Sequence, residues 1–266
     1  MFNLFNDPAI INLPTFFRYP LAKLIAKKRE PVAKKIYQEL GGSSPILKLT
    51  KDQSSALENN LNKKDSNNTH KCFIVMRCWH PRAEEVIKEV KLYEPDEIIL
   101  MPLYPQYSAA TSGSSIKEWK NVCKKNNYNI KTSTICCYPT DQKFINAHCK
   151  EILKKIEGLS NYKLIFSAHG LPEKNIKNGD PYQWQVEQSV KKIVDNLQSI
   201  FAIELFTASQ ALSFGNGKSS PFLESIMSLF RQEVTIVEED RVLHDDIVNA
   251  SEFINSLEID SLELFG

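Results

Sequence analysis

Several features that define particular protein classes are scarce or missing in this sequence. Nine glycines among 266 residues exclude a collagen-like chain. There is no run of about 18 apolar residues, so we expect no transmembrane helix. Lys and Arg number 33 against 32 for Asp and Glu, and this balance lacks the basic excess typical of nucleic-acid binding. The sequence contains no G-x-S-x-G, P-loop, H-E-x-x-H or dinucleotide-binding glycine motif.

The six cysteines do not indicate a metal centre. None of the six forms a C-x-x-C pair, so their spacing does not indicate a zinc or iron–sulfur cage. The first residues lack a basic stretch followed by an apolar one, and no secretory signal is visible. Reduced thiols and the missing signal together favour a cytoplasmic location.

What is present is a composition typical of a globular protein, with 42% hydrophobic and 24% charged residues, and a repeated alternation of two patterns. Short apolar runs of strand type occur at 72–76, 97–101, 131–137, 163–167 and, starting a fifth, 203–206. Helical spacing of apolar residues occurs at 81–90, 115–125, 141–156 and 181–197. Strands alternating with helices of this length predict an α/β protein, with a parallel sheet flanked by helices on both faces.

Two segments lie outside this alternation. Residues 59–70 are polar and predict a surface loop. Residues 14–28 mix apolar with basic side chains, and Phe16 and Phe17 are among the apolar ones. That mixture predicts a helix that packs on the core, with an amphipathic helix touching a membrane surface as the alternative.

Polar residues collect where the predicted strands end. Arg77 and His80 follow the first strand, Tyr104 and Tyr107 follow the second, and His169 follows the fourth. Ligands of open parallel sheets bind outside the carboxyl ends of the strands, so these residues predict a binding cleft.

Taken singly, these residues leave alternatives open. The hydroxyl-rich run Ser108–Ser115 is suited to cradling an anion or to forming a polar turn with a helix N-cap. Arg77 is suited to a structural ion pair or to a substrate carboxylate, and His80 to a surface or capping role. His169, between an apolar run and a Gly-Leu-Pro turn, is expected to be half-buried and suited to proton transfer or metal binding.

Four stretches resemble the ferrochelatase family, especially its members from intracellular alphaproteobacteria. These are FSAHGLPEK with GDPY (166–174 and 179–182), MPLYPQYS with TSGSS (101–108 and 111–115), MR with HP (76–77 and 80–81), and NLF to LP (3–5 to 13–14). The likeness runs from residue 1 to about residue 206. The same architecture serves cobalt insertion into more reduced tetrapyrroles, but the GDPY and YPQYS runs argue against that alternative.

The resemblance implies a fold of two similar α/β halves with a porphyrin in the cleft between them. Residues 1–140 would be the first half, 141–206 the start of an incomplete second half, and 207–266 a divergent tail. It also implies insertion of ferrous iron into protoporphyrin IX or coproporphyrin III in haem biosynthesis, with no organic cofactor and with ferrous iron as a substrate. Porphyrin and ferrous iron would be the partners, nucleic acid would not, and the protein would be cytoplasmic with peripheral contact to the inner membrane.

The resemblance also implies roles for single residues. His169 takes the place of the family's active-site histidine, which binds the metal or accepts a pyrrole proton. A neutral imidazole can serve as base or ligand, which agrees with this role. Arg77, Tyr104, Tyr107 and Ser114 are the expected substrate-binding residues.

Three departures from the family pattern favour an alternative. The chain starts after the family's opening strand and loop, and Cys78 stands where the family has a tyrosine. Beyond Phe206 the family's segment with the acidic partner of the histidine is missing, and the acids at 238–240 and 244–246 are expected to form a solvated face. The alternative function is a non-catalytic porphyrin- or haem-binding remnant. We hypothesise that the tail arose by a shifted reading frame or an internal deletion.

Overall fold

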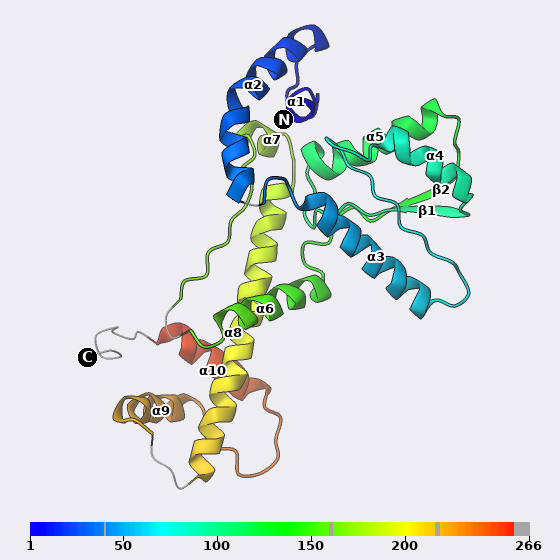
Figure 1. Cartoon of the computed structure of the whole chain (residues 1–266). Coiled ribbons are helices and arrows are strands. Elements are labelled where there is room, and N and C mark those ends of the chain that lie inside the picture. Colours follow the sequence, from blue (N-terminus) through cyan, green and yellow to red (C-terminus); the bar gives the residue numbers. More distant parts are fainter. Residues whose placement is uncertain (40, 160–161, 216–218, 258–266) are drawn as a thin grey trace. The chain divides into compact units, whose positions relative to one another are not determined.

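The computed structural model describes residues 1–39, 41–159, 162–215 and 219–257 (Figure 1). These residues form two compact units. The first comprises Met1–Cys137 and Glu173–Tyr182, and the second comprises Tyr138–Pro172 and Gln183–Gly266.

The first unit is built on a small parallel sheet. Strands β1 (Glu97–Leu100) and β2 (Lys131–Thr134) pair in parallel, with Glu97 opposite Lys131. Helices α4 (Ala83–Tyr93) and α5 (Ser114–Lys125) supply the buried core. Its members recur at helical spacing and are Ala83, Val86, Ile87, Val90, Trp119 and Val122. The parallel sheet with packed helices confirms the α/β class in its coarse form.

The remaining helices of the first unit contribute no residue to this core. They are α1 (Phe2–Phe5), α2 (Thr15–Glu39), α3 (Ile46–Lys64), α7 (Glu173–Lys177) and the single-turn π-helix η1 (Ala109–Gly113). In α2 only Ala22 is buried, whereas Phe16 is 82% exposed and Phe17 60%. The expectation that this helix packs on the core is therefore wrong.

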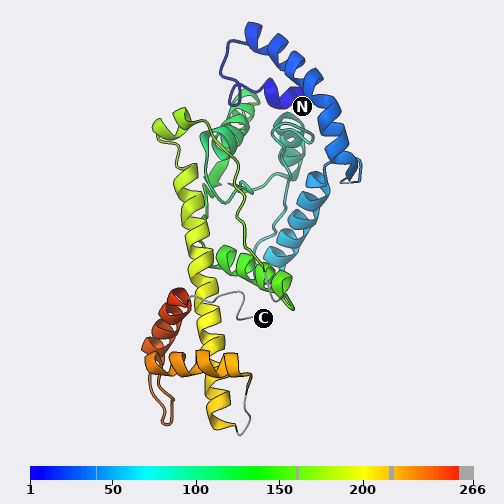
Figure 2. The ribbon, with the colours of Figure 1, turned by 90° about the vertical axis from the view of Figure 1, so that its left-hand side faces the viewer.

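The second unit is helical. Its helices are α6 (Gln142–Ile156), α8 (Tyr182–Phe214, whose first residue belongs to the first unit), α9 (Pro221–Glu233) and α10 (His244–Ser256). Helix α6 packs on the first half of α8 through Ile145, Cys149, Ile193 and Leu197 (Figure 2).

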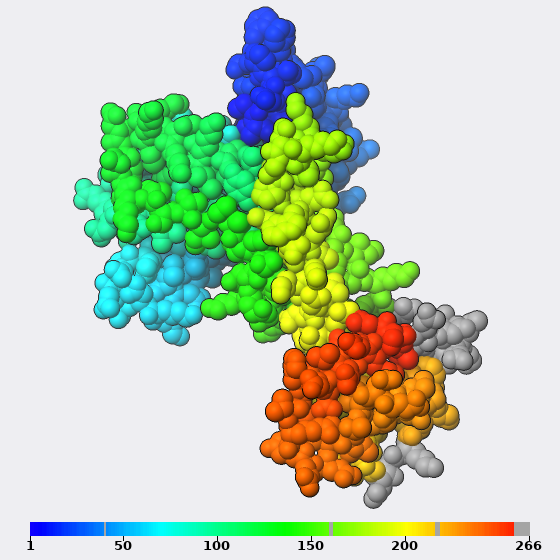
Figure 3. Space-filling view, turned by 180° about the vertical axis from the view of Figure 1, so that it is seen from behind, coloured from blue at the N-terminus to red at the C-terminus, as the bar shows by residue number. Residues whose placement is uncertain are grey.

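Helices α9 and α10 pack with the second half of α8 (Figure 3). Their shared core consists of Ala202, Phe206, Phe230, Val234, Ala250 and Phe253. The rings of Phe230 and Phe253 meet edge to face, with their centroids 5.2 Å apart.

Several predicted elements differ in the structure. Residues 163–167 have no regular secondary structure, and Ile165 is 83% exposed. A strand needs a neighbour for its backbone hydrogen bonds, and none of the described residues of the second unit is in a strand. The expected pair of similar halves is therefore not confirmed.

The predicted fifth strand at 203–206 is helical, because Ala202, Phe206 and Ser209 continue the buried stripe of α8 at helical spacing. Residues 59–64 extend α3 instead of starting a loop. Residues 72–76 form no strand, although Phe73 and Val75 pack on the first core. The strand predicted at 131–137 ends at Thr134.

Within the described ranges, no helix combines the length and the apolarity needed to cross a bilayer.

Candidate functional site

Arg77 lies at the centre of a polar network in the first unit. Its Nη2 is 2.9 Å and 2.8 Å from the two carboxylate oxygens of Asp7, and its Nη1 is 3.0 Å from Oε1 of Glu118. Its Nε donates to the Ser114 hydroxyl at 3.4 Å. Asp7 is buried, whereas Arg77 and Glu118 are partly exposed. Of the two interpretations of Arg77, the structure shows the ion pair.

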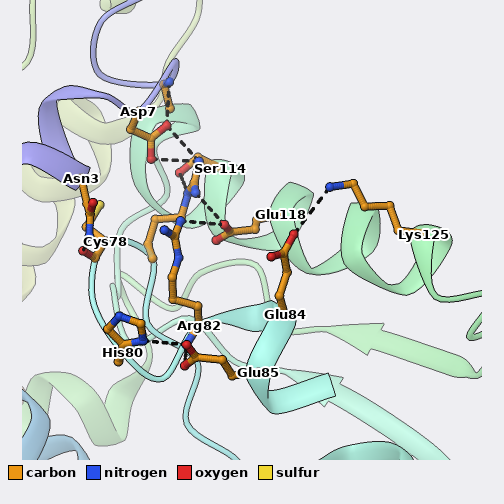
Figure 4. Close-up of polar contacts among 12 residues, drawn as sticks. Asn3, Asp7, Cys78, His80, Arg82, Glu84, Glu85, Ser114, Glu118 and Lys125 are labelled. Carbon is orange, nitrogen blue, oxygen red and sulfur yellow. Dashed lines mark hydrogen bonds and ion pairs between the residues drawn. The ribbon is translucent and has the colours of Figure 1, made fainter. Parts of the chain in front are cut away.

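The network balances its charges. Arg82 Nη2 lies 3.4 Å from the same Glu118 oxygen, so two guanidinium groups face two carboxylates (Figure 4). Beside them, Asn3 donates to the carbonyl of Cys78 at 3.2 Å. Burial raises the pKa of the Cys78 thiol, and the charge of Asp7 raises it further. The thiol is therefore neutral at physiological pH and is a poor nucleophile.

The hydroxyl segment, Ser108–Ser115, begins a helical stretch. Ser108 Oγ accepts from the amide of Ala110 at 3.2 Å, which confirms the N-cap interpretation. The same hydroxyl donates to Oδ2 of Asp180 at 2.8 Å, and the amide of Ala109 donates to that oxygen at 2.9 Å. Asp180 therefore supplies a carboxylate at the place where this helix start would otherwise receive an external anion.

Two tyrosines, Tyr104 and Tyr107, precede this segment in the sequence. A Cβ atom at Gly113 would lie 2.5 Å from the Tyr107 hydroxyl, so this glycine is what lets the phenol approach the backbone. Tyr104 is 55% exposed, yet local burial raises the pKa of its hydroxyl, and the Cys78 thiol adds to the shift. The Tyr104 hydroxyl therefore stays protonated at physiological pH, although half of the residue is exposed.

His80 contacts the first turn of α4. Its Nδ1 is 2.7 Å from Oε1 of Glu85, while Oε2 of Glu85 accepts from the amide of Arg82 at 2.9 Å. The hydrogen bond from the Arg82 amide is the main cause that lowers the pKa of Glu85, and His80 contributes to it. His80 is exposed and supports the start of α4, which agrees with a surface or capping role.

His169 lies in the second unit, on a segment without regular secondary structure. It is exposed, so the expectation of a half-buried imidazole is wrong. The burial was expected from a strand at 163–167, and that strand is not formed. Of the predicted site residues, the structure brings together Arg77 and Ser114 in the first unit.

A family model described as Ferrochelatase matches residues 1–214. The chain belongs to the ferrochelatase family. The match ends at the last residue of α8, so the likeness continues beyond Phe206, where the motif analysis ended it.

Relatives that carry the name ferrochelatase support this assignment. The Pelagibacter ubique protein is 77% identical over 197 residues, which are 74% of this chain and 57% of that protein. A Wolbachia protein (subspecies Drosophila simulans) is 50% identical over 200 residues, and the Caulobacter vibrioides protein is 46% identical over 200 residues. These alignments cover 74% of this chain and 63% and 57% of the respective relatives. The chain thus spans somewhat more than half the length of these ferrochelatases.

Three acidic residues with contacts in this region were not predicted from the sequence: Asp7, Glu118 and Asp180. Asp7 and Glu118 give no local signal, because their partner Arg77 is 70 residues from one and 41 from the other in the sequence. Asp180 lies in the GDPY motif, and this motif could have identified it as a candidate site residue.

The described residues also contain no group of three or more His, Cys, Asp or Glu side chains placed to hold a metal ion. A surface hollow of about 350 Å³ in the first unit is lined by nine residues, and none of them is a predicted site residue. They are Trp119, Lys120, Cys123, Lys124, Asn127, Tyr128, Asn129, Ile130 and Thr132.

Proposed function

We propose that this protein takes part in haem biosynthesis by inserting ferrous iron into a porphyrin, either protoporphyrin IX or coproporphyrin III. The observation that carries the proposal is the 77% identity over 197 residues to a protein named ferrochelatase, within a family match over residues 1–214. Porphyrin and ferrous iron are then substrates, and the reaction needs no organic cofactor.

We propose that His169 receives the protons or the metal. Metal insertion replaces two pyrrole N–H protons by a divalent cation, so a neutral imidazole can act as base or as a transient ligand. His169 is supported by its exposure and by its place in the family motif FSAHGLP, where Gly170 follows it.

We further propose that Arg77, Tyr104, Tyr107 and Ser114 receive the substrate. The porphyrin carries anionic propionates on a flat apolar ring, and this combination suits phenols, hydroxyls and a guanidinium. Tyr104 has the best support, because its side chain is half-exposed. Arg77 has the least, because Asp7 and Glu118 already bind its guanidinium.

The division of the chain and its location are also proposals. Residues 1–140 would form the first chelatase half, 141–206 the start of the second, and 207–266 a separate tail. A cytoplasmic protein that touches the inner membrane is supported by α2, where exposed Phe16, Phe17 and Leu24 stand among lysines.

A metallation assay tests the function. The full chain is mixed with protoporphyrin or coproporphyrin and anaerobic ferrous iron, with zinc in a parallel reaction, and the absorption of the metalloporphyrin is followed. We expect insertion by the wild type and a loss of about a hundredfold or more in His169→Ala, because general-base catalysis contributes about that much. His148→Ala, which removes another exposed histidine of the second unit, is the matched control.

The outcomes separate the alternatives. Porphyrin binding without insertion would identify the non-catalytic remnant. A chain that binds no porphyrin contradicts both functions. Insertion that is unchanged in His169→Ala contradicts the role of that histidine but not the activity.

A further inference from the structure

Two neighbouring cysteines lie just beyond the sheet of the first unit. Strand β2 ends at Thr134, and the amide of Ile135 still donates to the carbonyl of Leu100 at 2.9 Å. Cys136 and Cys137 follow in a segment without regular secondary structure. Neighbouring side chains of a strand point to opposite faces, and this restriction does not apply beyond the end of β2. The two cysteine side chains can therefore turn toward each other.

The two thiols are in contact. Burial raises the pKa of the Cys136 thiol, and its hydrogen bond with the thiol of Cys137 raises that pKa further. Cys136 is exposed and Cys137 is half-buried, so a small molecule in solvent can reach the pair. Cys72 is also half-buried, but among the described residues the groups that shift its pKa include no second cysteine. The first unit thus offers a pair of thiols at 136–137 and a single thiol at Cys72.

The backbone between the two cysteines disfavours a disulfide. The peptide bond that joins them is trans, and a trans peptide holds consecutive Cα atoms about 3.8 Å apart. Ordinary disulfides join Cα atoms that are about 4.4–6.8 Å apart, so an S–S bond at this place would be strained. An atom that bridges the two sulfurs enlarges the ring that they close and relieves this strain. The pair is therefore better suited to chelating a ligand than to oxidation.

The ligand that fits this pair is soft and takes two sulfur atoms from the protein. Thiolates select soft ions over hard ones. Structural zinc takes four ligands, and the described part of the chain holds no group of three or more His, Cys, Asp or Glu side chains placed for a metal ion. Trivalent arsenic that carries one organic group has two further bonding positions, and two adjacent thiols can occupy both of them.

We propose that Cys136 and Cys137 form a binding site for trivalent organic arsenicals. Each thiol gives up its proton and forms an As–S bond. The two protons leave with the oxygen of the arsenical as water, and the arsenic stays trivalent, so the step needs no oxidant or reductant. The inference is independent of the proposed function, because it uses neither porphyrin nor ferrous iron nor any residue that receives a role there.

The first experiment titrates the full chain with phenylarsine oxide and follows the complex by intact-protein mass spectrometry. We expect a single arsenical on the wild type. Cys136→Ser and Cys137→Ser should each weaken binding about a hundredfold or more, because the second As–S bond forms within one molecule at a high effective concentration. Cys72→Ser, which removes a half-buried thiol from another irregular segment of the same unit, is the control and should bind like the wild type. Equal binding by the wild type and Cys136→Ser overturns the proposal.

The second experiment uses the wild type alone, so it decides the question even if a serine variant fails to fold. The arsenical complex is treated with a monothiol or with a dithiol at the same concentration of thiol groups. We expect the dithiol to remove the arsenical and the monothiol to leave it bound, because two separate monothiol molecules cannot match a chelating pair. Equally complete removal by the monothiol would show that a single sulfur holds the arsenic, and the proposal would be wrong.

Discussion

Arg77 illustrates how a residue's surroundings decide between two kinds of chemistry. A guanidinium matches a carboxylate in shape and charge, whether that carboxylate belongs to a substrate or to the protein. Here it meets Asp7, whose side chain is only 5% exposed, and Glu118. Removing a charge from a buried pair leaves its partner without compensation, and this costs more than the pair contributes to stability.

We therefore expect Arg77→Met to lower the free energy of unfolding by about 3–5 kcal/mol. The double variant Arg77→Met with Asp7→Asn should recover much of this loss, because the buried negative charge is gone while the acceptor for the amide of Ala9 remains. Chemical denaturation measures both values. Lys34→Met, which breaks the exposed pair of Lys34 with Glu30, is the control and should leave stability unchanged within error. A double variant no more stable than Arg77→Met would contradict the explanation.

Gly113 is a second residue whose role can be isolated. An added Cβ would meet the Tyr107 hydroxyl at 2.5 Å and its Cζ at 3.1 Å, so we expect Gly113→Ala to cost about 1–3 kcal/mol by overpacking. In a double-mutant cycle, Tyr107→Phe should relieve part of that cost, because it removes the nearest atom. Gly170→Ala is the control, since nothing lies within 4 Å of the added carbon. Additive effects of Gly113→Ala and Tyr107→Phe would show that the two residues are not in this contact.

At the scale of elements, the start of α4 couples stability to pH. The Arg82 amide and then His80 bind the Glu85 carboxylate and lower its pKa from the ordinary value of about 4.5. A carboxyl group whose pKa is lowered by folding stabilises the protein above its unfolded pKa, and this contribution is lost as the pH falls through the folded pKa.

We expect the wild type to be more stable than Glu85→Gln at pH 7 and the difference to vanish below the lowered pKa of Glu85. Thermal unfolding of both proteins from pH 7 down to pH 3 measures this difference. Glu89→Gln, also in α4 and exposed, is the control. A difference that stays constant down to pH 3 would mean that the charge of Glu85 does not support the helix.

The elements that could be predicted are those whose local pattern agrees with their final packing. Strands β1 and β2 and helix α6 fall within the predicted ranges, whereas α4 continues to Tyr93 and α5 begins one residue early, at Ser114. Helix α4 buries the stripe that its sequence shows. Short apolar runs are ambiguous between strand and helix, and the run at 203–206 became helical because the stripe of α8 continues through it.

The candidate site could be predicted in part, for a different reason. Sequence motifs placed Arg77 and Ser114 in one region, and a hydrogen bond joins them. The contacts of Asp7 with Arg77 and of Asp180 with Ser108 could not be predicted, because separations of 70 and 72 residues leave no periodic signal in the sequence. Whether His169 meets a porphyrin remains a prediction.

At the scale of the whole molecule, each unit has a core of its own. The tail beyond the family match takes part in one of them. Helix α9 begins with Pro221 after Ser220, whose hydroxyl accepts from the amide of Leu223 at 3.3 Å, and its Phe230 is completely buried. A shifted reading frame gives no reason for a capped helix with a matching apolar face, so this observation weighs against that hypothesis.

The separate cores lead to a prediction for the whole chain. Phe230→Ala should cost about 3–5 kcal/mol, because it empties the centre of the core shared by α8, α9 and α10. In native-state hydrogen exchange we expect faster exchange in these three helices and little change in α4 and α5. Ile87→Ala, in the core of the first unit, should give the reverse pattern. If Phe230→Ala changed no exchange rate in α9 or α10, these two helices would not share the core that the structure gives them, and the prediction would be wrong.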